Sequence, residues 1–259
     1  MSTIQINNET FNYRLSGPED APVLFFSNSL GTTYSMWNKQ VEHFSKNYRV
    51  LSYDTRGHGE SIKNKGPYTL DQLGNDVIQI TQALGIDKFS FCGISMGGLI
   101  GLWLGIHAAE KLDKLVVCNT AAKIGQETGW NERAALVRSQ GMDPVADGSV
   151  GRWFTEGFVQ ANPAIVNDLI KSLRQTDAEG YASCCEALAH ADLREKIALI
   201  KVPTLIVAGD HDPVTTIADA KAITAKITGS SQVNLNASHL SNIETHETFN
   251  HALDTFLKG

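Results

Sequence analysis

A serine set among glycines is the residue of this chain best suited to covalent chemistry. Ser95 lies in Gly93-Ile94-Ser95-Met96-Gly97-Gly98, after the strand-like run Phe89–Cys92 and before the apolar run Leu99–Ile106. A sharp turn from strand to helix needs small residues on both sides of the serine, and it exposes the hydroxyl at the start of the helix. Backbone N–H groups there can hold developing negative charge. The pattern predicts a nucleophile for acyl transfer, and a glycine-rich turn with an incidental serine is the alternative.

Two loops farther along the chain supply the base and the carboxylate that a nucleophilic serine requires. Asp212 follows the apolar run Thr204–Ala208, and His239 follows the run Gln232–Leu235. Both runs are strand-like, and ligands of open α/β sheets bind at the carboxyl ends of strands. The order serine, aspartate, histidine is the order of a nucleophile-elbow triad. We therefore predict Ser95 as nucleophile, Asp212 as acid and His239 as base.

Neighbouring residues compete for two of these roles. Asp210 is the alternative acid, but Asp212 precedes Pro213, which keeps its backbone extended and out of a helix. His211 is adjacent to the acid, yet the loop after the final strand suits the base better. Asp210, His211 and Asp212 also admit interpretation as a metal cluster, but no second histidine lies at ligand spacing, so we predict no metal site. Five further histidines fall in helical patterns and are interpreted as ordinary side chains: His43, His107, His190, His246 and His251.

An oxyanion needs two donors. The backbone N–H of Met96, next to the nucleophile, is the first. The second is expected in the loop Ser27–Thr32, after the strand-like run Val23–Phe26. We predict the N–H of Leu30, because Gly31 allows the backbone to approach closely.

The composition excludes several classes of function. Of the 259 residues, 42% are apolar and 19% charged, as in ordinary globular proteins. Lys plus Arg number 22 and Asp plus Glu 28, a net charge of −6, which argues against nucleic acid or an anionic membrane as partner. The longest apolar run, Leu99–Ile106, is too short to span a bilayer. With no recognisable signal peptide and no CxxC pair among four cysteines, we expect a cytoplasmic protein with reduced thiols.

The segments that must position these residues alternate between strand and helix. Asn7-Asn8 joins two strand-like segments in a predicted hairpin, and an apolar stripe from Leu70 to Leu84 predicts a helix that ends at Gly85. Such alternation implies right-handed crossovers. We predict an α/β fold with a mostly parallel sheet and helices on both faces.

The strand signals disappear between residues 122 and 194. Asn162-Pro163 is a typical helix start, followed by apolar residues on one face: Ile165, Leu169 and Leu173. Thr176 with Glu179 predicts a capping box that opens a second helix. We interpret residues 122–194 as a helical lid inserted into a core formed by residues 1–121 and 195–259.

With these residues in place, the chain resembles the α/β-hydrolases over nearly its whole length, and within them the 3-oxoadipate enol-lactonases. Five strings carry the resemblance: Ser27-Asn28-Ser29-Leu30-Gly31-Thr32, Met36-Trp37, Asp54-Thr55-Arg56-Gly57-His58-Gly59, Cys92-Gly93-Ile94-Ser95-Met96-Gly97-Gly98 and Ala208-Gly209-Asp210-His211-Asp212-Pro213. Asn28-Ser29 stands where much of the superfamily has His-Gly, and this form is similar to that of the enol-lactonases. The serine at the elbow excludes relatives with aspartate there, such as haloalkane dehalogenases. By resemblance His58 is a scaffold residue near the oxyanion loop.

The resemblance implies hydrolysis of 3-oxoadipate enol-lactone to 3-oxoadipate through an acyl-enzyme, in the β-ketoadipate pathway of aromatic-compound breakdown. It implies a small anionic lactone as partner and neither a metal nor an organic cofactor. The alternatives are a lidded carboxylesterase, a hydrolase that cleaves carbon–carbon bonds in ring-fission products, and a small-molecule receptor with slow turnover.

An anionic substrate of an acidic protein requires a local cation, most effectively an arginine on the carboxylate. We favour Arg133 because it lies near Trp130 at the entry of the lid, with Trp130 and Trp153 as apolar walls. The remaining candidates are other basic residues of the lid: Arg138, Arg152, Arg174 and Lys123.

Overall fold

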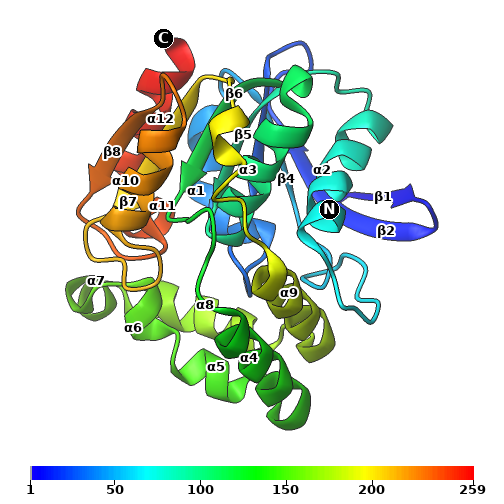
Figure 1. Ribbon diagram of the computed structural model, residues 1–259, viewed down its shortest axis with the longest axis vertical. Helices are drawn as coiled ribbons and strands as arrows, with labels where there is room; N and C mark the ends of the chain where they lie inside the picture. Colours follow the sequence, from blue (N-terminus) through cyan, green and yellow to red (C-terminus); the bar gives the residue numbers. More distant parts are fainter. Residues whose placement is uncertain (1) are drawn as a thin grey trace.

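A single twisted sheet carries the fold. The computed structural model describes residues 2–259, and its strands follow the order β1-β2-β4-β3-β5-β6-β7-β8 in one eight-stranded sheet (Figure 1). Strand β2 is antiparallel to β1 and β4, and every later pairing is parallel. The strands are β1 (Ser2–Ile6), β2 (Glu9–Ser16), β3 (Val23–Ser27), β4 (Arg49–Tyr53), β5 (Phe89–Ile94), β6 (Leu112–Cys118), β7 (Thr204–Gly209) and β8 (Ser231–Leu235). The predicted hairpin is present, with Asn7 and Asn8 at φ of 52° and 65° in its turn.

Helices cover both faces of this sheet, as the alternation of elements predicts. Helix α1 packs beside α12, while α2 packs on α3. The helices of the core are η1 (Tyr34–Trp37), α1 (Asn38–Phe44), α2 (Leu70–Ala83), α3 (Met96–His107), η2 (Ala109–Lys111), η3 (Ile197–Leu199), α10 (Ile217–Lys226), α11 (Ser241–Glu244) and α12 (His246–Lys258). None of the helices in residues 2–259 has the length and apolar character needed to cross a membrane.

Six helices lie between β6 and η3, at the carboxyl ends of the strands and at the bottom of Figure 1. They are α4 (Glu127–Gln140), α5 (Asp143–Asp147), α6 (Val150–Trp153), α7 (Glu156–Ala161), α8 (Pro163–Arg174) and α9 (Ala178–His190). The chain enters and leaves this segment side by side, because the N–H of Leu193 donates to the carbonyl of Ala122 at 2.8 Å. We keep the name lid for residues 122–194, whose exact bounds stay a prediction.

Two details of the predicted lid helices are wrong. The N-cap of α9 is Asp177 and not Thr176: the Asp177 carboxylate accepts from the N–H of Gly180 at 2.7 Å, whereas the Thr176 hydroxyl donates back to Ser172 in the preceding helix. In α8, Ile165 is 44% exposed and the neighbouring Val166 is buried, so the buried face is rotated from the predicted one.

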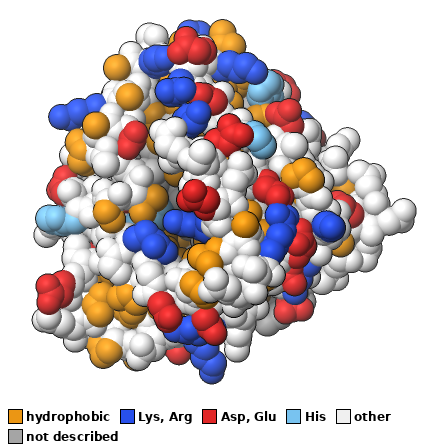
Figure 2. Space-filling model, turned by 60° about the horizontal axis from the view of Figure 1, so that its bottom comes forward, with side chains coloured by type: hydrophobic (Ala, Val, Ile, Leu, Met, Phe, Trp, Pro, Cys, Tyr) orange, Lys and Arg blue, Asp and Glu red, His pale blue; other side chains and the backbone are white. Residues whose placement is uncertain are grey.

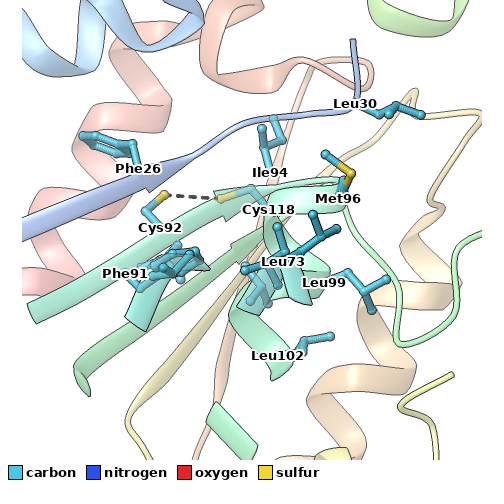
Figure 3. Packing of buried hydrophobic residues seen from close by; sticks show 14 of the residues in the cluster. Phe26, Leu30, Leu73, Phe91, Cys92, Ile94, Met96, Leu99, Leu102 and Cys118 are labelled. Carbon is cyan, nitrogen blue, oxygen red and sulfur yellow. Dashed lines mark hydrogen bonds between the residues drawn. The ribbon is translucent and has the colours of Figure 1, made fainter. Parts of the chain in front are cut away.

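The core beneath the nucleophile turn is closely packed with apolar side chains from the central strands and α3 (Figure 3). Cys92 and Cys118 lie on the adjacent strands β5 and β6, with their sulfurs 3.9 Å apart. All four cysteines of the chain are buried free thiols. Burial raises the pKa of the Cys92 thiol, so it behaves as an apolar core residue.

Candidate active site

Ser95 lies at a strained turn between β5 and α3. Its φ of 57° and ψ of −116° are unfavourable for a residue with a side chain, at a cost of about 1–3 kcal/mol. The glycines around it are sterically required: a Cβ on Gly93 would lie 2.1 Å from the Gly97 carbonyl oxygen, and a Cβ on Gly97 would lie 2.3 Å from that of Ser27. This is the geometry predicted for a nucleophile elbow.

Asp212 and His239 are in direct contact. His239 Nδ1 donates to Asp212 Oδ2 at 2.8 Å, and both residues are buried. Burial opposes ionisation of Asp212, but the neighbouring imidazole and several hydrogen bonds outweigh it, so the pKa of this carboxyl lies below its ordinary value. The rival acid Asp210 is exposed and is bound by the Asn234 amide at 3.3 Å. The contact with His239 thus belongs to Asp212.

Four further donors hold the Asp212 carboxylate. The N–H groups of Val214 and Thr215 donate to Oδ1 at 2.8 and 3.1 Å, and the Thr215 hydroxyl donates to Oδ2 at 2.8 Å. The fourth donor is the amide of Asn119, 2.9 Å from Oδ2. Ser241 donates to the other end of this amide at 2.6 Å, so the amide nitrogen of Asn119 faces the carboxylate. The sequence analysis did not single out Asn119, although it directly follows β6, which lies between the strands that lead to Ser95 and Asp212.

Leu30 and Met96, the two predicted N–H donors, lie at the same end of the sheet (Figure 3). Neither N–H takes part in the hydrogen bonds found within residues 2–259. The next N–H, that of Gly31, is already used, because it donates to His58 Nε2 at 2.8 Å. His58 Nδ1 in turn lies 3.2 Å from the Arg56 carbonyl oxygen and donates to it. The arrangement leaves two N–H groups available for an oxyanion and anchors the loop through a buried imidazole.

The lid covers a cavity of about 220 Å³ above Ser95. Ser95, His239 and Leu30 line it from the core. The three predicted lid residues Trp130, Arg133 and Trp153 line it from the opposite side, together with residues that sequence reasoning did not single out: Ser149, Tyr181, Gln126 and Arg152, the last of which stood only among the alternatives. Figure 2 views this side of the molecule, where Lys and Arg side chains border a hollow near its middle.

Two arginines of the lid, Arg133 and Arg152, therefore line the same cavity. Arg133 stacks on the Trp130 ring at 4.9 Å, and Arg152 donates to the Ser149 hydroxyl at 2.9 Å. Neither forms an ion pair with an acidic residue of the described chain. Burial and the charge of Arg133 lower the pKa of Arg152. Two guanidinium groups without counter-charge make this cavity suitable for an anion.

The remaining lid cations have other partners. Arg138 is paired with Glu179 and Glu186, and Arg174 with Asp143 and Asp147. Lys123 lies 3.5 Å from Asp192. These residues are absent from the lining of the cavity.

Comparison with known proteins identifies the family. Residues 22–140 match the family model of the alpha/beta hydrolase fold. The chain is 50% identical to 3-oxoadipate enol-lactonase 2 of Acinetobacter baylyi, over 99% of this chain and 96% of that protein. It is 47% identical to 3-oxoadipate enol-lactonase 1 of the same species, over 99% and 97%. The crystal structure of the enol-lactonase from Burkholderia xenovorans superposes with a TM-score of 0.98 at 42% identity, over the full length of both chains.

This chain belongs to the 3-oxoadipate enol-lactonase family. The resemblance seen in the sequence is confirmed, and so is the α/β-hydrolase fold. The sequence did not point to Asn119, and it offered Arg152 only as an alternative to Arg133. Arg152 lies in the four-residue helix α6, which has no periodic signal, and Asn119 is a single polar residue at a strand end.

Proposed function

We propose that this chain hydrolyses 3-oxoadipate enol-lactone to 3-oxoadipate. The observation that carries the proposal is the meeting of Ser95 and His239 with two unpaired arginines in one small cavity. A volume of about 220 Å³ is below the roughly 300–1,000 Å³ of sites for drug-sized ligands. A compact lactone with one carboxylate suits such a site, and the enol-lactonase names of its relatives support the same substrate.

In the first half of the reaction, Ser95 Oγ attacks the lactone carbonyl carbon while His239 accepts the hydroxyl proton. The N–H groups of Leu30 and Met96 stabilise the oxyanion. When the ring C–O bond breaks, the enolate oxygen takes the proton from His239. An enolate is a better leaving group than an alkoxide, and the released enol tautomerises to the ketone. Asp212 holds the imidazole in the required tautomer and stabilises its cation.

In the second half, His239 accepts a proton from water, which attacks the acyl-enzyme and releases 3-oxoadipate. The returned proton restores the Ser95 hydroxyl. This scheme needs no metal or organic cofactor. A cytoplasmic location, within the breakdown of aromatic compounds, belongs to the same proposal and agrees with the free thiols of the four cysteines.

Arg133 and Arg152 would bind the carboxylate that the reaction leaves untouched. Arg152 is held by Ser149, so it offers a preset direction, while Arg133 lies over the Trp130 ring. Trp130 and Trp153 would form apolar walls beside the lactone ring. A neutral ester lacks this contact and would lose its contribution to binding.

The first test is the loss of enol-lactone absorbance with purified protein, compared with p-nitrophenyl acetate and a ring-fission dienoate. We expect fast lactone opening and weak activity on the other two. Ser95→Ala should lower lactone turnover by roughly 10⁴–10⁶-fold. Ser90→Ala, on the same strand but away from the cavity lining, is the matched control and should turn over normally. Activity on the simple ester alone would overturn the substrate assignment, and normal turnover by Ser95→Ala would overturn the nucleophile.

The second test concerns the arginines. Arg152→Met and Arg133→Met should each raise KM for the lactone by about ten- to a hundredfold, since a hydrogen bond to a charged group contributes about 1.5–3 kcal/mol. Their KM for p-nitrophenyl acetate should not change. Arg138→Met removes an arginine of the same helix as Arg133 that is paired outside the cavity, and its KM should stay at the unmodified value. Equal effects on the charged and the neutral substrate would contradict carboxylate binding.

A further inference from the structure

Ser238, the residue before His239, is held by three elements at once. Its N–H donates to Glu244 Oε2 at 2.8 Å, and its carbonyl oxygen accepts from the Asn119 amide at 3.1 Å. Its hydroxyl donates to the carbonyl oxygen of Arg152 at 3.1 Å. Ser238 is buried, and so is its bond to Asn119, while its bonds to Glu244 and Arg152 are partly buried. The peptide that leads into the catalytic imidazole therefore has its position set from the sheet, from α11 and from the lid.

Glu244 joins this peptide to the lid. The same carboxylate accepts from the backbone N–H of Thr155, at 3.2 and 3.4 Å to its two oxygens, and from the Thr155 hydroxyl. Thr155 is the N-cap of α7 and lies three residues after Arg152. One side chain thus accepts from both the loop of His239 and the lid segment that follows the cavity-lining residues Arg152 and Trp153.

A second contact runs beside the first. The N–H of Leu240 donates to the carbonyl oxygen of Trp153 at 3.1 Å. The lid strip Arg152–Thr155 is therefore bonded to the chain on both sides of His239. Arg152 and Trp153 line the cavity, and their carbonyl groups hold the loop of His239. A shift of the strip would therefore move the cavity wall and this loop together.

Glu244 links two segments of the chain by accepting hydrogen bonds, and not by pairing with a cation. It forms no ion pair with a basic residue in the part of the chain that the structure describes. Its partners are N–H and O–H donors on two separate segments, and an ionised carboxylate offers two acceptor oxygens to them. A glutamine keeps one acceptor oxygen and places an NH2 group, which can only donate, where the second oxygen was.

We propose that Glu244 is a positioning residue that fixes His239 relative to the lid strip. The position of the lid then affects kcat as well as substrate binding. The inference rests on the proposed function for the role of His239 as base. It adds that Thr155, which lies outside the cavity lining and forms no hydrogen bond with a triad residue among residues 2–259, acts on catalysis through Glu244. A misplacement of about 1 Å in a catalytic group can cost about a hundredfold in rate.

The test compares Glu244→Gln, Thr155→Val and the double variant, with Glu247→Gln as control. Glu247 is an exposed glutamate three residues farther along, on α12. The substrates are the anionic enol-lactone and p-nitrophenyl acetate, and the labelling rate of Ser95 by a fluorophosphonate gives a third readout. We expect both single variants to lower kcat about ten- to a hundredfold on both substrates with little change in KM, and to slow the labelling. The double variant should be no slower than Glu244→Gln, and Glu247→Gln should match the unmodified protein.

Three results would overturn the inference: an unchanged kcat in Glu244→Gln, a change confined to KM in Thr155→Val, or losses that multiply in the double variant. Thermal unfolding of each variant checks the fold, and Thr155→Val carries the test if Glu244→Gln does not fold. Should the unmodified protein fail to open the lactone yet react with the ester and the fluorophosphonate, the proposed substrate would be wrong. The same comparison of variants would then still decide the role of Glu244.

Discussion

His58 supports the oxyanion loop only while its imidazole is neutral. Its Nε2 accepts from the N–H of Gly31, and protonation would replace this acceptor with a donor. Burial is the main cause that lowers the pKa of His58 below its ordinary value, and the hydrogen bond to the Arg56 carbonyl opposes this effect only in part. The loop that carries Leu30 is therefore protected from protonation of its anchor near neutral pH.

The sign of the resulting pH dependence follows from the depressed pKa. Below about pH 6.5 the unfolded chain binds a proton at His58 that the folded chain does not, so stability falls as pH falls. The contribution of His58 to this slope of the free energy of unfolding is at most about 1.4 kcal/mol per pH unit. We predict that His58→Gln, which can keep an acceptor near Gly31, loses this part of the pH dependence. Urea unfolding of both proteins at pH 7.5 and 5.5 measures it, and the other histidines cancel in the difference. Parallel changes in the two proteins would contradict the prediction.

Asn119 is the polar residue whose contribution to the triad is most directly testable. Asn119→Leu removes the amide that donates to both Asp212 and the Ser238 carbonyl. We expect kcat on the lactone to fall about ten- to a hundredfold, because a buried hydrogen bond to a carboxylate is lost. Asn234→Leu removes the equivalent bond to the exposed Asp210 and should leave kcat unchanged. Equal kcat values for the two variants would show that Asn119 has no special role.

At the scale of elements, the sequence predicts what periodicity and local sterics determine. The central strands carry short apolar runs and the core helices carry helical patterns, and their positions agree with the structure within a few residues. The nucleophile turn was predictable because only small residues tolerate its backbone. The lid was harder: α6 spans four residues, the N-cap of α9 is Asp177 where two adjacent residues both suit a cap, and Ile165 faces solvent. Short helices take their orientation from tertiary contacts, which local patterns do not contain.

Replacing a glycine by alanine should change the free energy of unfolding in opposite directions in α3 and in α7. Gly97→Ala, in the first turn of α3, places a Cβ 2.3 Å from the Ser27 carbonyl oxygen, so the turn must shift and both stability and turnover should fall. Gly157→Ala, in α7, meets nothing within 4 Å and should raise the free energy of unfolding by about 0.4–1 kcal/mol. Urea unfolding and lactone turnover of the two variants test both. A stable, active Gly97→Ala would contradict the close packing of the elbow.

At the scale of the whole molecule, the topology brings distant residues to one place. The loops after β3, β5, β7 and β8 meet at the carboxyl edge of the sheet, so Leu30, Ser95, Asp212 and His239 line or adjoin one cavity. This convergence was predictable because the carboxyl ends of parallel strands lie at one edge of the sheet, where open α/β sheets bind their ligands. The contacts of the lid strip Arg152–Thr155 with the His239 loop were not, because they join segments more than 80 residues apart, and the Arg152 carbonyl and the Thr155 N–H are backbone groups that every residue carries.

The buried ion pair of Arg56 tests how the N-terminal hairpin is joined to the rest of the molecule. Arg56 is 2% exposed, contacts Asp76 on α2 at 2.6 Å and Glu9 at the start of β2 at 2.8 Å, and lies over the rings of Phe11 and Tyr68. Arg56→Met leaves the Asp76 carboxylate buried without its counter-charge, so we expect a loss of about 3–5 kcal/mol in the free energy of unfolding.

Two comparisons separate this mechanism from a loss of packing. Arg56→Met combined with Asp76→Leu removes both charges of the pair. This double variant should recover most of the lost free energy of unfolding, because a buried ion pair stabilises a protein little more than apolar residues of similar volume do. Arg138→Met breaks ion pairs of similar length that are only about two-thirds shielded from water, and it should cost no more than about 1 kcal/mol. Urea unfolding of the four proteins measures all three differences. If the double variant is no more stable than Arg56→Met, the stabilisation comes from contact of the guanidinium with the two rings rather than from its charge.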